Sequence, residues 1–133
     1  MEVEGSCHCG QVTYRAIVDP DKASLCHCTD CQTLSGSAYR VSIPAPGETF
    51  QILSGVPRIY IKTADSGNKR AHAFCPNCGA PIYAAAEKDP QVFSLRVGGL
   101  RQRALLPPRR QIWCGSAVPW SANVEKLPAF ERQ

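Results

Sequence analysis

The fold of this chain is decided at residues 75–79, which read Cys75-Pro76-Asn77-Cys78-Gly79. A Cys-x-x-Cys turn places two thiols side by side, as a zinc ion requires of two neighbouring ligands. The glycine after the second cysteine lets the backbone curl back with a positive φ. We therefore interpret 75–79 as a zinc knuckle, and we expect the flanking segments 69–74 and 80–83 to be the strands of a zinc-ribbon hairpin.

A second pair of cysteines lies near the start of the chain, in Cys7-His8-Cys9. Side chains alternate along a strand, so both thiols can point to the same face. Zinc takes four ligands in a tetrahedron, and closing a long loop around it stabilises a fold strongly. The alternative is that these residues are reduced cysteines of the core. The predicted structural zinc ligands are Cys7, Cys9, Cys75 and Cys78.

The third cluster, residues 26–31, reads Cys26-His27-Cys28-Thr29-Asp30-Cys31 and has no fourth cysteine nearby. Three protein ligands with an open position are typical of a catalytic zinc, which can polarise a carbonyl or hold a bound thiol or water as its anion. We expect Cys26, Cys28 and Cys31 to form such a site. Two alternatives stay open: Asp30, His72 or Cys114 closes the site and makes it structural, or the site is empty in the isolated protein.

The eight cysteines are expected to be reduced. Residues 1–5 have neither the basic start nor the apolar run of a signal peptide, and no apolar stretch approaches the ~20 residues that a membrane helix needs. The sequence therefore predicts a cytoplasmic protein with no membrane partner. In that compartment clustered cysteines serve as metal ligands more often than as disulfides.

The net charge argues against a nucleic-acid partner. The formal value of +4 counts neutral cysteines, whereas seven thiolates and two Zn²⁺ would bring the loaded protein to +1. The basic segments 101–103 and 109–110 are interpreted as solvated loop, or else as carboxylate binders, because arginine pairs well with carboxylates. We interpret the aromatic residues of the predicted strands as core rather than as a base-stacking platform. These are Tyr60, Phe74, Tyr83, Phe93 and Trp113.

At 133 residues, the chain is expected to be one zinc-binding domain spanning 1–133. Eleven prolines and ten glycines favour short strands over long helices. Segment 29–34 can form a helical turn that Gly36 ends. Segment 10–18 alternates, with Val12, Tyr14, Ala16 and Val18 on one side. The sequence thus predicts an all-β or β-rich fold. Further strands are expected at 39–43, 48–53, 58–62, 92–97 and 111–114.

The three cysteine clusters, in this order and spacing, resemble the glutathione-dependent formaldehyde-activating enzyme family, which shares its domain with centromere protein V. The resemblance begins at Gly5-Ser6-Cys7-His8-Cys9-Gly10. It continues through 26–31 with Ser35-Gly36 and through Phe74-Cys75-Pro76-Asn77-Cys78-Gly79. It ends at 112–120, which is similar to the family's C-terminal stretch, so it covers nearly the whole chain.

The resemblance implies an Mss4-like zinc-binding fold of short antiparallel sheets with zinc-ribbon knuckles. It implies up to two zinc ions per chain, a structural one on the four-cysteine set and a catalytic one on Cys26, Cys28 and Cys31. The implied activity is that of a carbon–sulfur lyase, which interconverts formaldehyde plus glutathione with S-(hydroxymethyl)glutathione. Glutathione would then be a co-substrate, and the partners would be a small-molecule thiol and an aldehyde.

Two other functions stay open at this point. One is a non-catalytic zinc-ribbon module that binds a protein partner, which a fourth protein ligand at the 26–31 cluster would favour. The other is a thiol redox or metal-handling protein, which a disulfide between Cys31 and either Cys26 or Cys28 would favour.

Overall fold

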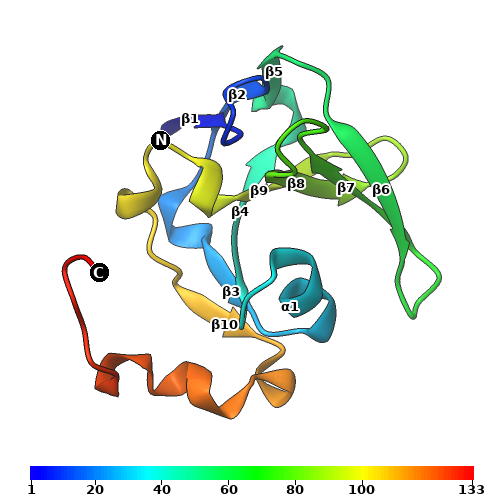
Figure 1. The fold of residues 1–133 in the computed structure, drawn as a ribbon. Helices are drawn as coiled ribbons and strands as arrows, with labels where there is room; N and C mark the ends of the chain where they lie inside the picture. The colour runs from blue at the N-terminus through cyan, green and yellow to red at the C-terminus, as the bar shows by residue number, and fades with distance from the viewer.

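The computed structural model describes residues 1–133 and arranges them in two β-sheets (Figure 1). The smaller sheet has three strands in the order β1-β2-β5, and the larger has seven in the order β10-β3-β4-β9-β8-β7-β6. One short helix, α1, is the only α-helix. The predicted β-rich class is therefore confirmed, and the architecture is consistent with the Mss4-like fold.

The elements are short, as the frequent prolines and glycines predict. The strands are β1 Glu2–Ser6, β2 Thr13–Ile17, β3 Ser24–Cys26, β4 Arg40–Pro46, β5 Gln51–Ser54, β6 Arg58–Thr63, β7 Lys69–Phe74, β8 Pro81–Ala86, β9 Val92–Arg96 and β10 Arg110–Ile112. Helix α1 spans Thr29–Ser35, and the 3₁₀ turns are η1 Pro20–Lys22, η2 Gly47–Thr49, η3 Val97–Gly99, η4 Arg103–Leu105, η5 Cys114–Ser116, η6 Pro119–Ala122 and η7 Val124–Lys126. No helix has the length and apolarity needed to cross a membrane.

All but one of the strand pairings are antiparallel. The exception is β10, which pairs in parallel with β3 so that Ile112 lies opposite Cys26. On its other side, β3 pairs antiparallel with β4, where Cys26 lies opposite Arg40. The second cysteine cluster is thus held at the end of a strand that has neighbours on both sides.

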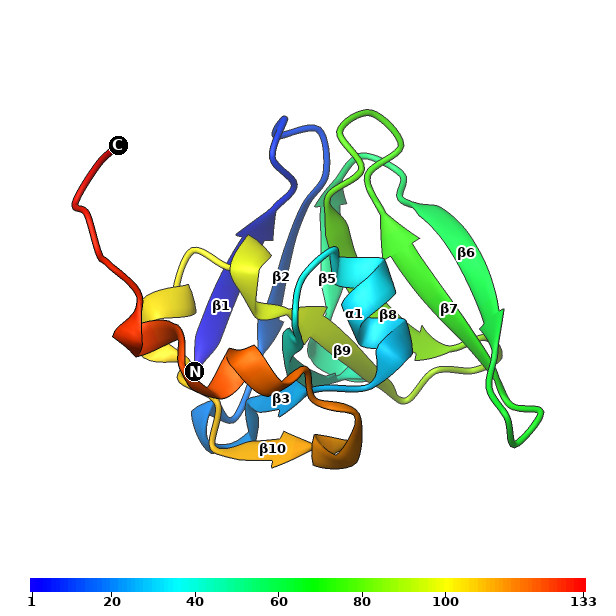
Figure 2. The same cartoon turned by 60° about the horizontal axis from the view of Figure 1, so that its bottom comes forward.

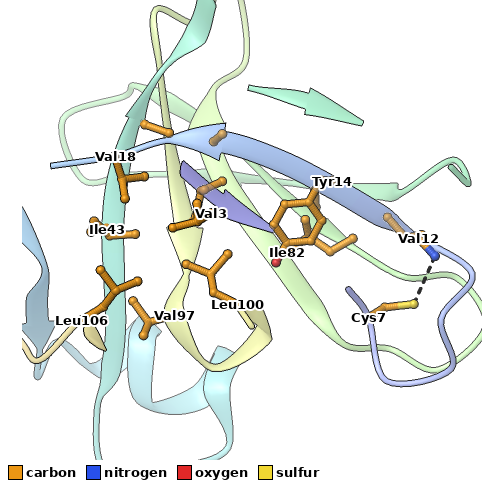
Figure 3. Packing of buried hydrophobic residues seen from close by; sticks show 14 of the residues in the cluster. Val3, Cys7, Val12, Tyr14, Val18, Ile43, Ile82, Val97, Leu100 and Leu106 are labelled. Carbon is orange, nitrogen blue, oxygen red and sulfur yellow. Dashed lines mark hydrogen bonds between the residues drawn. The ribbon is translucent and has the colours of Figure 1, made fainter. Parts of the chain in front are cut away.

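The hydrophobic core lies between the two sheets (Figure 3). The alternation predicted for β2 is confirmed, because Val12, Tyr14, Ala16 and Val18 are each at most 3% exposed. Tyr83 and Phe93 were both predicted to be core residues, and they pack against Phe50 at the margin of this core. Side chains from both sheets and from segment 97–106 complete it, among them Val3, Ile43, Ile82, Leu95, Val97, Leu100 and Leu106.

The seven-stranded sheet has a second face, which lies beneath α1 (Figure 2). We call it the polar face because it carries Arg40, Ser42 and Arg96. Strand register decides which residues it carries, because side chains alternate between the two faces. Ile43 pairs with Leu95 on the core side, whereas Ser42 pairs with Arg96 on the other side. Cys26, Arg40 and His72 lie on the face that carries Arg96.

Some expected elements differ from the structure. Strands β1 and β3 were not predicted, and β2 begins at Thr13 because residues 10–12 belong to a turn. Tyr60 and Trp113 are not core residues, since they are 53% and 66% exposed. Tyr60 lies on β6, the last strand of its sheet, and Trp113 follows β10 at the opposite edge, so each side chain lies at a margin of the sheet and stays largely exposed.

Candidate metal centres

Two turns bring the first four cysteines together. The turn after β1 carries Cys7 and Cys9, and the turn between β7 and β8 carries Cys75 and Cys78, at the same end of the molecule (Figure 2). The four Sγ atoms lie within 4.8 Å of one another. Cys7 and Cys9 belong to a turn and not to a strand as expected, because Cys7 O accepts from the Gly10 amide at 3.2 Å. The predicted four-thiol set is therefore assembled, although by a different local geometry.

The four-cysteine group fits a tetrahedral zinc. Zinc–thiolate bonds of about 2.3 Å place sulfurs about 3.8 Å apart at the corners of a tetrahedron. The Sγ of Cys9 lies 3.6 Å from that of Cys7 and 3.8 Å from that of Cys75. The backbone amide of Val12 donates to Cys7 Sγ at 3.2 Å, as an amide does to a metal-bound thiolate (Figure 3). The predicted positive φ of Gly79 is present at 77°.

The remaining cluster sits where β3 ends and α1 begins. Cys26 is the last residue of β3, Cys28 is the N-cap of α1, and Cys31 lies in its first turn. Cys28 Sγ accepts the Cys31 backbone N–H at 3.3 Å, in the place that a serine hydroxyl takes in many helices. The predicted helical turn and its end are confirmed, since Gly36 adopts φ 65° and donates to Gln32 O. The three Sγ atoms lie within 4.8 Å of one another.

The C-terminal third of the chain supports this three-cysteine group. The Gln32 side chain donates to His27 O at 2.7 Å and to Ser116 O at 2.9 Å. The His27 backbone N–H donates to Ile112 O at 3.0 Å. His27 itself is buried, and its Nε2 donates to Gln111 Oε1 at 2.8 Å. Gln32 and Gln111 were not predicted to support the site, because the hydrogen bonds of both side chains to this region span 84 residues of chain.

No fourth Cys, His, Asp or Glu places a ligand atom within 4.8 Å of all three sulfurs. Asp30 instead accepts from Lys62 at 2.6 Å, and this ion pair raises the pKa of Lys62. His72 accepts from Arg96 through Nδ1 at 3.3 Å. Cys114 is exposed and belongs to neither cysteine group. The three residues considered as closing ligands therefore lie outside the group.

The chemistry of this donor set also fits a cation. Burial and the neighbouring Cys28 and Cys26 thiols raise the pKa of Cys31 to about 12. A thiol with a pKa raised this far ionises at neutral pH only if an additional positive charge lies beside it. Zinc ligands bind as thiolates, and a bound metal would provide that charge. Three thiols so placed therefore fit the metal that the sequence predicts.

Two arginines and a histidine lie beside the three-cysteine group. Arg96 donates to Ser42 Oγ at 2.9 Å and to His72 Nδ1 at 3.3 Å. Arginine can only donate, so His72 Nδ1 is the acceptor and the neutral ring carries its proton on Nε2. Burial and the Arg96 charge lower the pKa of His72 to about 4. Burial and the Arg40 charge lower the pKa of Arg96 to about 9, which leaves it protonated at neutral pH.

Two cavities meet at these arginines. The larger has a volume of about 990 Å³ and runs from Ser35 past Tyr14 to Arg101, and the smaller, of about 370 Å³, lies between Leu34 of α1 and His72. Arg40, Pro81 and Arg96 line both. A small molecule can therefore approach the polar face of the sheet from either side of these residues.

Comparisons with known proteins agree with the cysteine pattern. A Halomonas elongata protein named for the glutathione-dependent formaldehyde-activating enzymes is 24% identical over 115 residues, which cover 83% of this chain and 73% of that protein. An uncharacterized lyase of Schizosaccharomyces pombe is 29% identical over 90 residues, 63% of this chain and 58% of its own.

A crystal structure of a Rhodobacter sphaeroides protein shares the fold, with a TM-score of 0.62 at 19% identity, and covers 81% of this chain and 98% of that one. The family comparison spans most of the sequence, because residues 2–116 match one family over their whole length. The chain belongs to the family of glutathione-dependent formaldehyde-activating enzymes.

Proposed function

We propose that this protein is a zinc-dependent carbon–sulfur lyase whose substrate is a thiol–aldehyde adduct of the S-(hydroxymethyl)glutathione kind. Cys26, Cys28 and Cys31 hold the reacting zinc, and the four-cysteine group of residues 7, 9, 75 and 78 holds a structural one. Residues 1–133 act as one zinc-binding domain. Family membership supports a lyase of this general type. The named substrate and the dependence on zinc are our own additions to it.

The observation that carries the proposal is the difference between the two cysteine groups. One has four sulfurs and the other three, and no further Cys, His, Asp or Glu joins the second group. Structural zinc sites are closed by four protein ligands, whereas catalytic sites keep one position for water or substrate. In a protein-binding zinc ribbon both zinc sites would be structural, and we would expect both groups to be closed. The incomplete group therefore favours the enzyme over the binding module.

The reaction needs few groups. In the direction of synthesis a sulfur–carbon bond forms between thiol and aldehyde, the carbonyl electron pair moves to oxygen, and that oxygen gains the proton that the thiol loses. The reverse direction breaks the same bond. When bound, zinc supplies a Lewis acid that lowers the pKa of a thiol or polarises a carbonyl.

The chain's own residues hold the geometry for this chemistry. The Cys31 amide fixes Cys28 Sγ, and the Gln32 side chain ties the cysteine segment to the C-terminal stretch at Ser116. Such fixed donors keep the three sulfurs in place without rearrangement during a turnover. The positive charges of Arg40 and Arg96 favour a thiol in its anionic form at the adjoining cavities.

The test compares the wild type with Cys28→Ser and with the matched control Cys114→Ser. Metal content is measured by mass spectrometry, and exchange between formaldehyde, glutathione and their adduct is followed by NMR. We expect Cys28→Ser to lose one zinc and most of the activity, and Cys114→Ser to keep both, because Cys114 lies outside both groups. Unchanged catalysis in Cys28→Ser would exclude the catalytic assignment. Zinc-free wild type carrying a Cys28–Cys31 disulfide would favour the redox function instead.

A further inference from the structure

Arg40 is a buried cation and Arg96 a half-buried one, and neither has a carboxylate partner. Arg40 is 6% exposed, although arginine is almost never buried unless it is paired. The four ion pairs of the structure are Lys22–Asp19, Lys62–Asp30, Arg101–Glu4 and Arg109–Asp21, so neither arginine takes part in one. Arg96 donates hydrogen bonds to Ser42 and His72, but its Nε is buried without an acceptor. The Arg40 side chain makes no hydrogen bond of this kind. Both guanidinium groups therefore have donors to spare.

The cysteine thiolates do not neutralise this charge. Three thiolates with one Zn²⁺ carry a single negative charge, whereas two guanidinium groups carry two positive ones. Lys62 and Asp30 cancel each other through their 2.6 Å ion pair. Arg70, which pairs with Lys62 in the sheet, adds further positive charge to the same face. A loaded site would thus still attract an anion.

An anion can reach this place from solvent. Both arginines line the cavity of about 990 Å³ and the cavity of about 370 Å³, and strand pairing places Arg40 directly opposite Cys26. Guanidinium binds carboxylate through two parallel hydrogen bonds, and such bonds are strongest where water is largely excluded. The only carboxylate lining either cavity is Glu4, which already pairs with Arg101 at 2.7 Å.

We propose that Arg40 and Arg96 form a carboxylate-binding subsite that selects an acidic thiol over a neutral one. The subsite would anchor a carboxylate of the thiol while its sulfur reaches the cysteine group beside Arg40. This inference rests on the proposed function for the presence of a thiol substrate. The arginines are positioning residues in this scheme, because they hold a part of the substrate that does not react.

The test measures binding, not turnover. S-methylglutathione keeps both carboxylates of glutathione but has no free thiol, so it cannot form the adduct. Its affinity for zinc-loaded wild type, Arg40→Gln, Arg96→Gln and the control Arg101→Gln is measured by isothermal titration calorimetry. Arg101 lines the larger cavity but is already paired with Glu4. Losing a hydrogen bond between charged groups costs about 1.5–3 kcal/mol, so Arg40→Gln and Arg96→Gln should each weaken binding roughly 10- to 100-fold, and Arg101→Gln should not.

The dimethyl ester of S-methylglutathione tests the chemistry of the contact. It lacks both carboxylates, so wild type and Arg96→Gln should bind it equally weakly. Arg96→Lys, which keeps the charge but loses the planar fork, should bind the acid with intermediate affinity. Equal effects of Arg96→Gln on acid and ester would overturn the subsite, as would wild-type binding too weak to detect.

The same experiment separates the subsite from the lyase. Zinc content is measured for every variant. If Arg40→Gln and Arg96→Gln lose zinc and, once reloaded, bind S-methylglutathione like wild type, the arginines serve only to balance the thiolates and the subsite is wrong. Wild type that binds the acid through both arginines, yet forms no adduct, would keep the subsite and exclude the lyase.

Discussion

Replacing Gly5 with alanine tests the packing of the Tyr14 ring against Gly5, where both residues line the larger cavity. Gly5 lies on β1 directly opposite Tyr14 on β2, and the tyrosine ring covers it. A Cβ at residue 5 would lie 2.1 Å from Tyr14 Cζ and 2.5 Å from its hydroxyl oxygen, where ordinary contacts begin at 3.4 Å. Tyr14 is 1% exposed and packs against Phe50, which limits how far its ring can move away from β1.

The expected cost follows from this overlap. Overpacking a well-packed core costs about 1–3 kcal/mol, and a clash with a fixed ring belongs at the upper end. Alanine recovers about 0.5 kcal/mol because it restricts the unfolded chain. We expect Gly5→Ala to lower the free energy of unfolding by about 2–3 kcal/mol, and the melting temperature by roughly 6–12 °C for a chain of this size.

Gly98→Ala is the matched control. Gly98 lines the same cavity, has an ordinary φ, and nothing lies within 4 Å of the Cβ that alanine would add. Thermal unfolding of both variants, at equal zinc content, should show no loss for Gly98→Ala. A double-mutant cycle with Tyr14→Leu should recover part of the loss in Gly5→Ala, because the clash disappears with the ring. Equal melting temperatures for both glycine variants, or an additive cycle, would refute the packing argument.

Two further predictions concern the metal groups and their surroundings. Cys75→Ser should abolish the folded state, seen as collapsed NMR dispersion, whereas Cys31→Ser should stay folded with one zinc fewer. Cys75 belongs to the group that joins distant parts of the chain; folded Cys75→Ser would contradict this division. His72, whose pKa is lowered from 6.5 to about 4, is neutral in the folded protein but gains a proton on unfolding at mildly acidic pH. The stability that the neutral His72 contributes is therefore fully present above pH 6.5 and is lost as the pH falls towards 4. Over that range the free energy of unfolding of His72→Gln should fall by about 1–2 kcal/mol less than that of the wild type. Parallel denaturant titrations at each pH measure the difference, and identical pH slopes would exclude the histidine as its source.

Much of this structure could be predicted from local sequence signals. The helical turn at 29–35 ends at Gly36 as expected, and the alternating segment of β2 faces the core. The grouping of four cysteines from two distant segments was also predicted, because zinc accepts only a small set of donor arrangements. These features depend on a few neighbouring residues and on the chemistry of one side-chain type.

Features that depend on pairing partners could not be predicted. β1 has the sequence Glu-Val-Glu-Gly-Ser, which carries a single large apolar residue, and it becomes a strand because β2 supplies its hydrogen bonds and Tyr14 covers Gly5. For Tyr60 the strand was predicted correctly, but the burial of the side chain was not. Alternation shows which side chains share a face, but it does not show whether another element covers that face on an edge strand.

The arginine pair illustrates why the functional face was missed. In sequence, Arg40 and Arg96 are polar residues of alternating strands, and the usual interpretation places such residues in solvent. Antiparallel register sets Arg40 opposite Cys26 and Arg96 opposite Ser42, so that two cations 56 positions apart share one face with the cysteine group. Helix α1, which itself carries Cys28 at its N-cap and Cys31 in its first turn, then covers that face. One short helix thus both carries two of the three clustered thiols and covers a cationic face of the sheet. In a β-rich fold with such a cover, the polar half of each alternating strand is where substrate contacts are to be sought.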